Sequence, residues 1–368
     1  MKIVYIASVR LPTEKAHGVQ IMKTCEALAK SGIKTSLFVP NYSSTNDIKE
    51  DAFLYYGVRK LFTIKKLFGI RLIRLGALGF FSESLIFFIS VIFSSDFWKA
   101  DYIYSRDEMI VVLSSLLGRK SIWETHTGSY NYFAKIALKK AYLIVAISQG
   151  LKDFYVEKGT NSNKVVVAHD SVDLDEFKVS KTKNELREKF GLPQDKKIIL
   201  YVGRLDGWKG IKVFLDATKY FNDLQVALII GGDNDQINNL SKDYKNVIFW
   251  GYRPYKDLPM YQKLADVLVV PNTGKSEVSK FFTSPLKVFA YMASGVSIVA
   301  SDLPSIREIL NEDNSILVEP DNPKAFADAI NMILGDEGRA RMIREQALRD
   351  VRMYTWDERV KNILSSLK

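Results

Sequence analysis

Short apolar runs rich in β-branched residues alternate with helix-like segments along this chain, and this alternation constrains the fold most. The first half contains the runs KIVYIAS, KTSLFVP, DYIYS, SIWET and LIVAIS, and the second contains IILYVG, VALIIGG, VIFWG, VLVVPN, SIVAS and SILVEP. Short, continuous apolar runs are typical of strands buried on both faces of a parallel sheet. We therefore predict an α/β protein with doubly wound, Rossmann-like parallel sheets.

The chain is long enough for two domains. Its 368 residues exceed the size at which a single hydrophobic core stops growing, and 47% of them are apolar. A polar, charged passage near residue 178 separates the two groups of strands. We predict a first domain over 1–178 and a second over 179–354, facing each other across a cleft, with a C-terminal helix at 355–368 that joins the first domain.

The segment FFTSPLKVFAYMASGVSIVASDLPSIREIL at 281–310 predicts a helix whose start is suited to an anion. Ser284 is a favourable N-cap, Pro285 is a favourable first helical residue, and Gly295 ends the helix before a buried strand. Unpaired N–H groups and the positive end of the helix dipole attract phosphate at such a start. A structural helix start without a ligand is the alternative interpretation.

The segment KKIILYVGRLDGWKGIKVFLDA places two cations where open α/β sheets bind ligands. A strand ends at Gly203, a loop carries Arg204 and Lys209, and an amphipathic helix follows. Ligands of such sheets bind beyond the carboxyl ends of the strands. With the helix start at 284–287, the forked donors of Arg204 and the point charge of Lys209 predict a diphosphate clamp. A surface loop with two solvated charges is the alternative.

Three segments of the second half, GRLDGWKG, GYRPYKDLPMYQKLADVLVVPN and SPLKVFAYMASGVSIVASDLPSIREIL, resemble the nucleotide-sugar-binding half of family 4 glycosyltransferases, which have the GT-B fold. The resemblance extends from MKIVYIAS through WETH at 123–126 and AISQGLKDF at 146–154 to YTWDERVKNIL at 354–364. The order and spacing of these segments carry it, rather than any single motif. It implies a retaining hexosyltransferase that moves a sugar from a nucleotide-diphosphate donor to an acceptor held by the first domain.

The resemblance also implies roles for individual residues. The predicted catalytic set consists of Arg204, Lys209 and His126, and the histidine, in the E-x-H setting of WETH, would contact the transferred sugar. The loop at Gly18 would face the diphosphate and the acceptor. The residues predicted to bind the donor are Gly18, Gly203, Gly251, Tyr252, Arg253, Thr283, Ser284, Pro285, Leu286, Lys287 and Ala290. Without the resemblance, a loop histidine and a helix-start glycine are the simpler interpretations of His126 and Gly18.

The chain departs from the family at two positions. Relatives typically carry glutamates eight positions apart, one near the transferred sugar and one on the nucleotide ribose, where this chain has Phe282 and Ala290. A lost charge-assisted hydrogen bond costs about 1.5–3 kcal/mol, so Ala290 predicts a donor affinity lowered by roughly tenfold to a hundredfold. Glu277 is the nearest upstream carboxylate that could substitute. A weakened enzyme and an engineered substitution both stay open as explanations.

The net charge of +10 is unevenly distributed. No acidic residue lies between Ala52 and Ser82, where large apolar residues alternate with the cations Arg59, Lys60, Lys65, Lys66, Arg71 and Arg74. Each cation near anionic headgroups contributes roughly 1 kcal/mol, so the pattern predicts peripheral attachment to the inner face of an anionic membrane. An ordinary helix pair with snorkelling side chains is the alternative. Nucleic acid is not an expected partner, because no nucleic-acid motif accompanies the charge.

Other features limit the location and the chemistry. The apolar segment LGALGFFSESLIFFISVIFSSDFW predicts a buried helix rather than a membrane span, because Glu83 and five serines interrupt it. The strand-like start MKIVYIASVRL lacks a signal-peptide pattern, which favours the cytoplasm. We expect Cys25 to be a buried structural thiol. The spacing of the three histidines matches no metal motif, and we expect neither a metal nor a cofactor.

These features together predict a retaining glycosyltransferase of surface polysaccharide assembly, with a polyprenyl-diphosphate glycan or another glycolipid as acceptor. The clamp would neutralise the departing diphosphate, and closure of the cleft would exclude water. Two alternatives stay open: a catalytically idle homologue that binds nucleotide or supports a partner enzyme, and a nucleotide-sugar epimerase of the same two-domain shape. An epimerase needs acid and base carboxylates around its substrate, and the segments expected at the cleft contain few.

Overall fold

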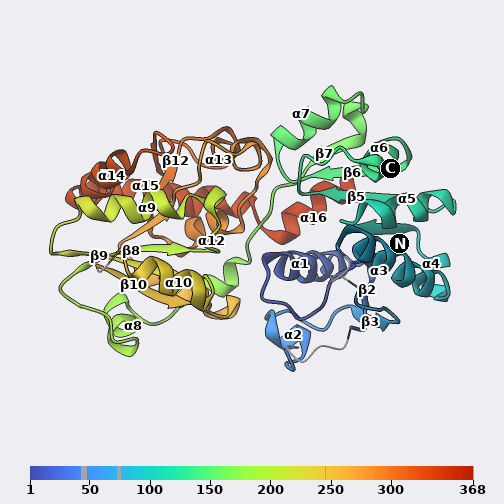
Figure 1. Ribbon diagram of the computed structural model, residues 1–368, viewed down its shortest axis with the longest axis horizontal. Helices are drawn as coiled ribbons and strands as arrows, with labels where there is room; N and C mark the ends of the chain where they lie inside the picture. Colours follow the sequence, from blue (N-terminus) through green and yellow to red (C-terminus); the bar gives the residue numbers. More distant parts are fainter. Residues whose placement is uncertain (43–47, 73–75, 245, 368) are drawn as a thin grey trace. The chain divides into compact units, whose positions relative to one another are not determined.

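The protein folds into two compact α/β units, as shown by a computed structural model that describes residues 1–42, 48–72, 76–244 and 246–367 (Figure 1). The first unit comprises Met1–His169 together with Trp356–Lys368, and the second comprises Asp170–Thr355. Each unit contains one parallel β-sheet with helices packed on it. The predicted α/β class with two Rossmann-like domains is therefore confirmed.

The first unit contains, over its described residues, a seven-stranded sheet in the order β3-β2-β1-β4-β5-β6-β7 with every pairing parallel. Its strands are β1 (Lys2–Ile6), β2 (Lys34–Pro40), β3 (Thr63–Leu67), β4 (Tyr102–Ser105), β5 (Ser121–Thr125), β6 (Leu143–Ala146) and β7 (Val165–Val167). Its helices are α1 (Ala16–Lys30), α2 (Ala52–Tyr55), α3 (Gly76–Ile92), α4 (Ser95–Trp98), α5 (Glu108–Leu116), α6 (Tyr132–Lys140), α7 (Gln149–Glu157) and α16 (Trp356–Ser365).

The second unit contains, in the part of the chain that the structure describes, a six-stranded parallel sheet in the order β10-β9-β8-β11-β12-β13. Its strands are β8 (Lys197–Val202), β9 (Gln225–Ile230), β10 (Val247–Gly251), β11 (Val267–Val270), β12 (Ser297–Ser301) and β13 (Ile316–Val318). Its helices are α8 (Lys183–Lys189), α9 (Ile211–Ala217), α10 (Asn234–Ser241), α11 (Leu258–Lys263), α12 (Leu286–Ser294), α13 (Pro304–Arg307), α14 (Pro323–Gly335) and α15 (Glu337–Asp350).

Alternating side chains of the second sheet enter two separate hydrophobic clusters. Along β8, Ile198 and Leu200 pack in the cluster that contains residues of α11 and α12, whereas Ile199 and Tyr201 pack in the cluster that contains residues of α9 and α14. This alternation follows from the two-residue period of a strand. Both faces of the sheet are therefore covered, as the continuous apolar runs predicted.

The boundary between the units differs from the one predicted near residue 178. Unit 2 begins at Asp170, so residues 170–178 belong to it rather than to the first domain. The physical reason is packing, because Leu174 and Phe177 contact the same hydrophobic cluster as α11 and α12. Strand β7 was not predicted either. Its three valines stand inside the polar, charged passage that the sequence analysis assigns to the connection between the two domains.

The basic segment, residues 59–74 with the six predicted lipid-facing cations, contains an edge strand, β3, which the sequence analysis did not predict. Side chains of a strand point alternately to its two faces, so its two lysines are separated. Lys65 forms an ion pair with Asp96, whereas Lys66 lines a hollow of about 50 Å³ together with Arg10. Lysines on an edge strand also hinder pairing with another chain. Arg74, one of the six predicted lipid-facing cations, lies outside the described residues.

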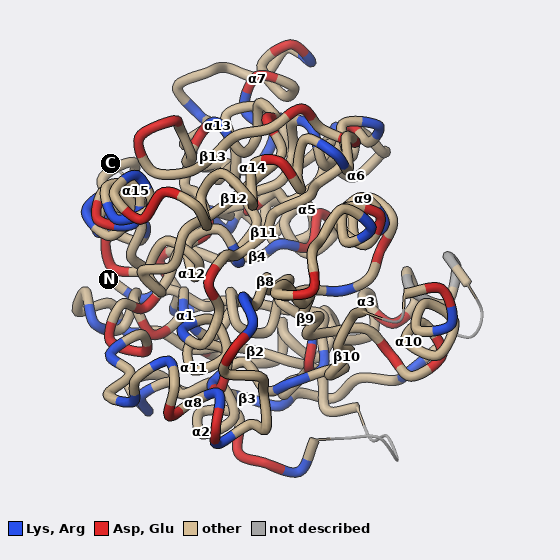
Figure 2. Tube along the Cα trace, turned by 90° about the vertical axis from the view of Figure 1, so that its left-hand side faces the viewer, with Lys and Arg blue, Asp and Glu red and all other residues tan. Residues whose placement is uncertain are grey.

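The apolar segment before β4 forms α3 and α4, and α3 is buried on one side only. Phe87 and Val91 are fully buried against β1 and β4, whereas Ile89 and, just beyond the helix end, Phe93 are exposed. Among the helices of the described residues, none combines the length and the apolar character that crossing a membrane requires. Away from the basic segment, helices such as α8 and α15 carry charges of both signs (Figure 2).

Candidate functional site

Glycines let the carboxyl ends of β8, β9 and β10 approach one another closely. Gly231 has a φ of 124°, and a Cβ atom on it would lie 2.0 Å from the carbonyl oxygen of Gly203. The N–H of Gly231 donates to the carbonyl of Gly251 at 2.8 Å. Because no side chain fits between these strand ends, backbone groups line this edge of the sheet. Gly203 and Gly251, both predicted to bind the donor, lie at this edge.

The loop between β8 and α9 gathers the two predicted cations around one carboxylate. Asp206 forms ion pairs with Arg204 at 3.2 Å and with Lys209 at 3.8 Å. Burial lowers the pKa of Lys209, although Asp206 acts in the opposite direction. Gly210 ends the loop with a φ of 69°, and a Cβ atom there would lie 1.6 Å from the carbonyl oxygen of Pro271. The loop is therefore held against the segment that follows β11.

Helix α12 starts one residue later than predicted. Pro285 is its N-cap residue, with φ −70° and ψ 117°, and Gly295 ends the helix in the left-handed region, as expected. Ser284 does not cap the helix, because its hydroxyl accepts a hydrogen bond from the N–H of Asp170 at 3.0 Å. Pro285 has no side-chain acceptor, so no side chain caps the first N–H groups of α12. The predicted anion-attracting helix start is present, one residue further along.

Lys287, in the first turn of α12, holds a buried amine. Its Nζ makes no hydrogen bond to any residue that the structure describes, and it lies 4.5 Å from the centre of the Tyr201 ring. Burial, with repulsion from Lys209, lowers the pKa of Lys287 well below its usual value. Tyr201 donates its hydroxyl to the carbonyl of Arg204 at 2.8 Å, which links this turn to the loop after β8. An anion bound here would favour the charged amine and provide its missing partner.

The remaining residues predicted to bind the donor lie in the same unit. Tyr252 is exposed, and Arg253 places its guanidinium 5.6 Å from the centre of the Trp250 ring. Thr283 and Ala290 are buried. At the two positions where relatives carry glutamates, Phe282 ends the π-helical turn Val278–Phe282 and Ala290 lies inside α12. Glu277 immediately precedes that turn.

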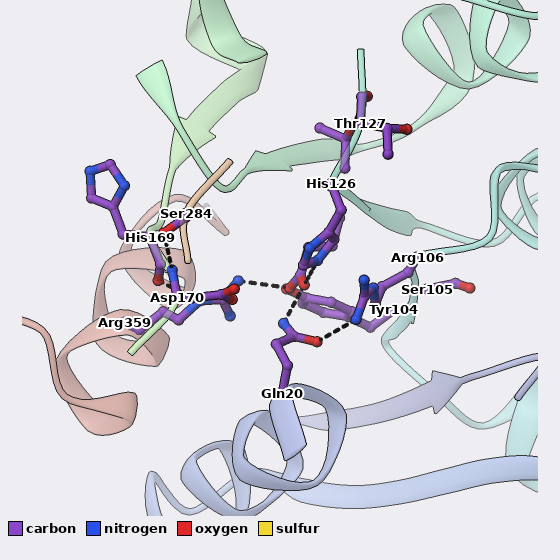
Figure 3. A network of polar contacts seen from close by, with 12 residues as sticks. Gln20, Tyr104, Ser105, Arg106, His126, Thr127, His169, Asp170, Ser284 and Arg359 are labelled. Carbon is purple, nitrogen blue, oxygen red and sulfur yellow. Dashed lines mark hydrogen bonds and ion pairs between the residues drawn. The ribbon is translucent and has the colours of Figure 1, made fainter. Parts of the chain in front are cut away.

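In the first unit, the buried side chain of Glu124 in β5 accepts four hydrogen bonds. The side chains that donate them, Gln20, Tyr104, His126 and Arg359, point toward one another in Figure 3. One oxygen, Oε1, accepts from Gln20 and, at 2.6 Å, from Nε2 of His126. The other oxygen, Oε2, accepts from Tyr104 and, at 2.9 Å, from Nη2 of Arg359. The network joins residues of α1, β4, β5 and α16, and it holds the His126 ring in a fixed orientation.

The charges around this network set the protonation of its members. Burial alone would raise the pKa of Glu124, but Arg359, His126 and Arg106 together hold that pKa well below its usual range. Burial and Arg106 lower the pKa of His126 to about 4, against the pull of Glu124. A neutral ring that donates Nε2–H to an ionised carboxylate leaves Nδ1 as an acceptor. His126 can therefore accept a hydrogen bond from a hydroxyl group of a ligand.

A cavity of about 550 Å³ lies in the first unit, and His126 lines it. On its wall, the rings of Phe81 and Phe133 stack with their centres 5.9 Å apart. Beside them, Asn131 donates to Glu108 at 2.6 Å, and burial raises the pKa of that carboxyl. Stacked rings next to a carboxylate and an amide form a surface suited to a sugar, whose apolar face and hydroxyls need both kinds of contact.

Gly18 has a structural explanation in this unit. It lies in the first turn of α1, and a Cβ atom there would lie 2.1 Å from the hydroxyl oxygen of Tyr56. That hydroxyl donates to the carbonyl of Thr13 and accepts from its N–H, so the tyrosine is firmly placed. The close packing of α1 against Tyr56 requires a glycine here, whether or not a ligand approaches.

Two further predictions concern the Cys25 thiol and the presence of a metal-binding site. Cys25 is buried, as predicted, and burial raises the pKa of its thiol well above the usual value. Within the described ranges, no group of three or more His, Cys, Asp or Glu side chains could hold a metal ion.

Sequence reasoning missed Arg359, although a signal for it was present. Trp356, Val360 and Ile363 follow a helical spacing in YTWDERVKNIL and are buried in α16. Arg359 falls on the same face, and a buried arginine needs an anionic partner. Its partner, Glu124, is 235 residues away in the sequence, so the pattern could indicate burial but not the contact.

The low pKa of His126 predicts a loss of stability on acidification. Below pH 6.5 an unfolded chain protonates this ring, whereas the folded protein does so only near pH 4, so stability falls as the pH drops through that window. Between pH 7 and pH 5 the loss is about 2 kcal/mol. In His126→Gln, the free energy of unfolding measured with urea should fall by about 2 kcal/mol less over this range. An identical pH dependence in both proteins would contradict the assignment.

Comparisons with known proteins agree with this architecture. The sequence model of the family "Glycosyl transferases group 1" matches residues 182–350. An uncharacterized glycosyltransferase of Methanocaldococcus jannaschii is 29% identical over 61% of this chain and 59% of its own length. A D-inositol 3-phosphate glycosyltransferase of Xylanimonas cellulosilytica is 24% identical over 71% and 64%. A putative teichuronic acid biosynthesis glycosyltransferase, TuaC of Bacillus subtilis, is 26% identical over 55% and 49%.

The chain thus spans about half to two thirds of the length of these relatives. Several solved structures match nearly the whole chain. HepE of Anabaena, in complex with UDP and glucose, has a TM-score of 0.78 at 16% identity and covers 100% of both chains. A sucrose-phosphate synthase from Thermosynechococcus elongatus has a TM-score of 0.80 at 19% identity and covers 99% of this chain and 98% of its own. The chain therefore has the GT-B fold, and most of its second unit matches the sequence model of glycosyl transferases group 1.

Proposed function

We propose that this protein is a retaining glycosyltransferase of the family 4 type and that its second unit binds the diphosphate of a nucleotide-sugar donor. The observation that carries the proposal is the buried amine of Lys287, which lacks a hydrogen-bond partner among the described residues, beside Lys209 and the uncapped start of α12. A buried amine in that setting needs an anion, and the helix start attracts one. The family match of residues 182–350 supports sugar transfer as the activity.

The proposed chemistry depends on electrostatics. Negative charge grows on the diphosphate as the bond to the sugar breaks, and cations fixed in advance lower the energy of that state. Lys209 and Lys287 are largely buried, so water screens their attraction only weakly. Arg204 is 66% exposed, so it can leave Asp206 and turn its forked donors toward a phosphate. The structure of HepE with UDP and glucose supports a nucleoside diphosphate as the ligand class.

The first unit is proposed to contact the transferred sugar and to bind the acceptor glycan. His126 would accept a hydrogen bond from the transferred sugar, as the resemblance implies, and its neutral state suits that role. The cavity beside it offers the stacked Phe81 and Phe133 rings and the Glu108–Asn131 pair to an acceptor glycan. The proposed acceptor is a glycolipid or polyprenyl-diphosphate glycan of surface polysaccharide assembly. The name of TuaC, a putative teichuronic acid enzyme, points to the same class of product.

The donor site can be tested by removing its cations. Arg204→Met and Lys209→Met should each weaken binding of UDP and UDP-sugars by about ten- to a hundredfold, because each removes a charge-assisted hydrogen bond. Isothermal titration calorimetry measures these affinities, with GDP and ADP compounds run in parallel. Lys212→Met is the matched control, since Lys212 lies at the start of α9, is 76% exposed and pairs with Asp216. Unchanged affinity in both site variants would refute the clamp.

A membrane-bound acceptor would bring the protein to the inner face of an anionic membrane through the basic segment. Four of its cations are exposed in the structure and should act together: Arg59, Lys60, Lys66 and Arg71. Lys65 is left out because it is only partly exposed and pairs with Asp96. Replacing the four by Gln should lower binding to phosphatidylglycerol vesicles by roughly a hundredfold or more, at about 1 kcal/mol for each cation.

The matched control for this experiment replaces four exposed cations of the second unit by Gln: Lys181, Lys219, Lys242 and Arg341. Lys219 pairs with Asp216, as Lys60 pairs with Asp51 in the basic segment. Both variants lose the same charge, so only the position differs. Vesicle sedimentation at constant salt measures the binding. Equal loss in the two variants would show a general charge effect and would contradict a basic docking segment.

The missing glutamates support a second candidate, an idle or impaired homologue. The chain has Phe282 and Ala290 where relatives carry glutamates. The carboxylate expected to accept a hydrogen bond from the nucleotide ribose is therefore missing at Ala290. Ala290→Glu should raise donor affinity by about tenfold to a hundredfold if the site binds nucleotide but lacks this one bond. Turnover assays with UDP-, GDP- and ADP-sugars then separate the two cases. Tight binding without any turnover in the Ala290→Glu variant would favour the idle homologue.

A further inference from the structure

We propose that Arg359 of α16 is a positioning residue for His126 and that it acts through Glu124. The catalytic consequence rests on the proposed function, because only a glycosyltransferase would use His126 in sugar transfer. The structural part of the inference does not, since it concerns which nitrogen of the His126 ring carries the proton.

Arg359 reaches Glu124 from the far end of the chain. Its side chain is 1% exposed, and its Nη2 lies 2.9 Å from Oε2 of Glu124. Its Nε donates to the carbonyl of His169 at 2.9 Å. Arg359 does not line the cavity that His126 borders, so any effect on a ligand there must pass through another residue.

Arg359 can influence the His126 ring through Glu124, because the two carboxylate oxygens of Glu124 bind different residues. Oε2 accepts from Arg359 and Oε1 accepts from Nε2 of His126. While the guanidinium is present, the carboxylate stays ionised and can only accept, so the histidine must donate its Nε2–H. Without that charge, burial favours a protonated carboxyl, whose O–H can donate to Nε2 and leave the ring proton on Nδ1. Arg359 thus selects the tautomer of His126.

Other charges face the same ring and could mask the effect. Arg106 lies close enough to lower the pKa of His126, and it binds Oε1 of Gln20 at 3.1 Å. His17 and the carboxyls of Asp107 and Glu108 line the same cavity. Of the cations, only Arg359 donates to Glu124 itself among the described contacts. Removal of Arg359 should therefore change the tautomer, which the other charges control only at a distance.

The position of Arg359 gives the contact a second role in the fold. Helix α16 belongs to the first unit although it follows the second unit in the chain. Arg359 joins this helix to His169, the last residue of the first unit before the chain enters the second. One of the residues that join the two chain segments of the first unit is therefore also the strongest influence that keeps Glu124 ionised.

The chain has only three histidines, so nuclear magnetic resonance can follow each ring. The protein is labelled with ¹⁵N-histidine, and the ring nitrogen shifts are recorded between pH 5.5 and 8 without any ligand. Signals are assigned with His17→Gln and His169→Gln. In the wild-type protein we expect His126 to be neutral and protonated at Nε2 throughout. In Arg359→Met we expect that signature to be replaced by Nδ1 protonation, a mixture of tautomers or a charged ring, and Arg359→Lys should restore it.

Controls separate positioning from stability. Arg187→Met removes another buried arginine, which pairs with Asp266 at 2.5 Å in the second unit, and should leave the His126 signals unchanged. If Arg359→Met does not fold, Arg359→Gln replaces it, because glutamine keeps a donor but no charge. An unchanged His126 signature in a folded variant of either kind would overturn the proposal.

Activity assays then test the catalytic consequence. If His126 acts in sugar transfer, Arg359→Met should lower kcat by at least tenfold, leave the donor KM within about twofold, and be rescued in part by Arg359→Lys. A changed tautomer with unchanged kcat would retain the link from Arg359 to His126 but contradict the proposed role of His126. The two failures are therefore distinguishable.

Discussion

The parallel pairing of the strands in both sheets is the constraint on which the candidate sites depend. Parallel strands place all their carboxyl ends at one edge, so loops from distant parts of the sequence meet there. In the second unit this brings the loop after β8 beside the start of α12, and the glycines at the strand ends leave room for backbone to approach. In the first unit it brings Arg106, after β4, beside His126, after β5.

Each unit buries an ionisable side chain near this edge, but in opposite ways. Glu124 is a buried anion with its partners supplied by the protein, so the first unit is electrostatically complete there. Lys287 is a buried amine without a hydrogen-bond partner among the described residues, so a bound anion would complete the second unit there. A satisfied network fixes geometry, whereas an unsatisfied group provides free energy for binding. This contrast is the physical basis for assigning positioning to the first unit and diphosphate binding to the second.

The sequence predicted what depends on local patterns. The eleven apolar runs are strands, Gly295 ends its helix, and Cys25 is buried, because periodicity, helix capping and burial are encoded locally. The predictions that failed depend on distant contacts. Ser284 does not cap α12, since Asp170 engages its hydroxyl, and β3 was missed because an edge strand with two lysines lacks an apolar run. The partner of Arg359 and the burial of the Lys287 amine likewise follow from tertiary packing, which spacing does not reveal.

The central claim is that the loop after β8 and the first turn of α12 bind one diphosphate. The most direct test is a crystal structure of the protein with a bound nucleoside diphosphate. The account predicts phosphate oxygens within about 2.7–3.2 Å of Lys287 Nζ, of the Lys209 amine and of the first N–H groups of α12. A well-ordered nucleotide whose phosphates lie away from Lys287, with that amine still buried and making no hydrogen bond, would contradict it.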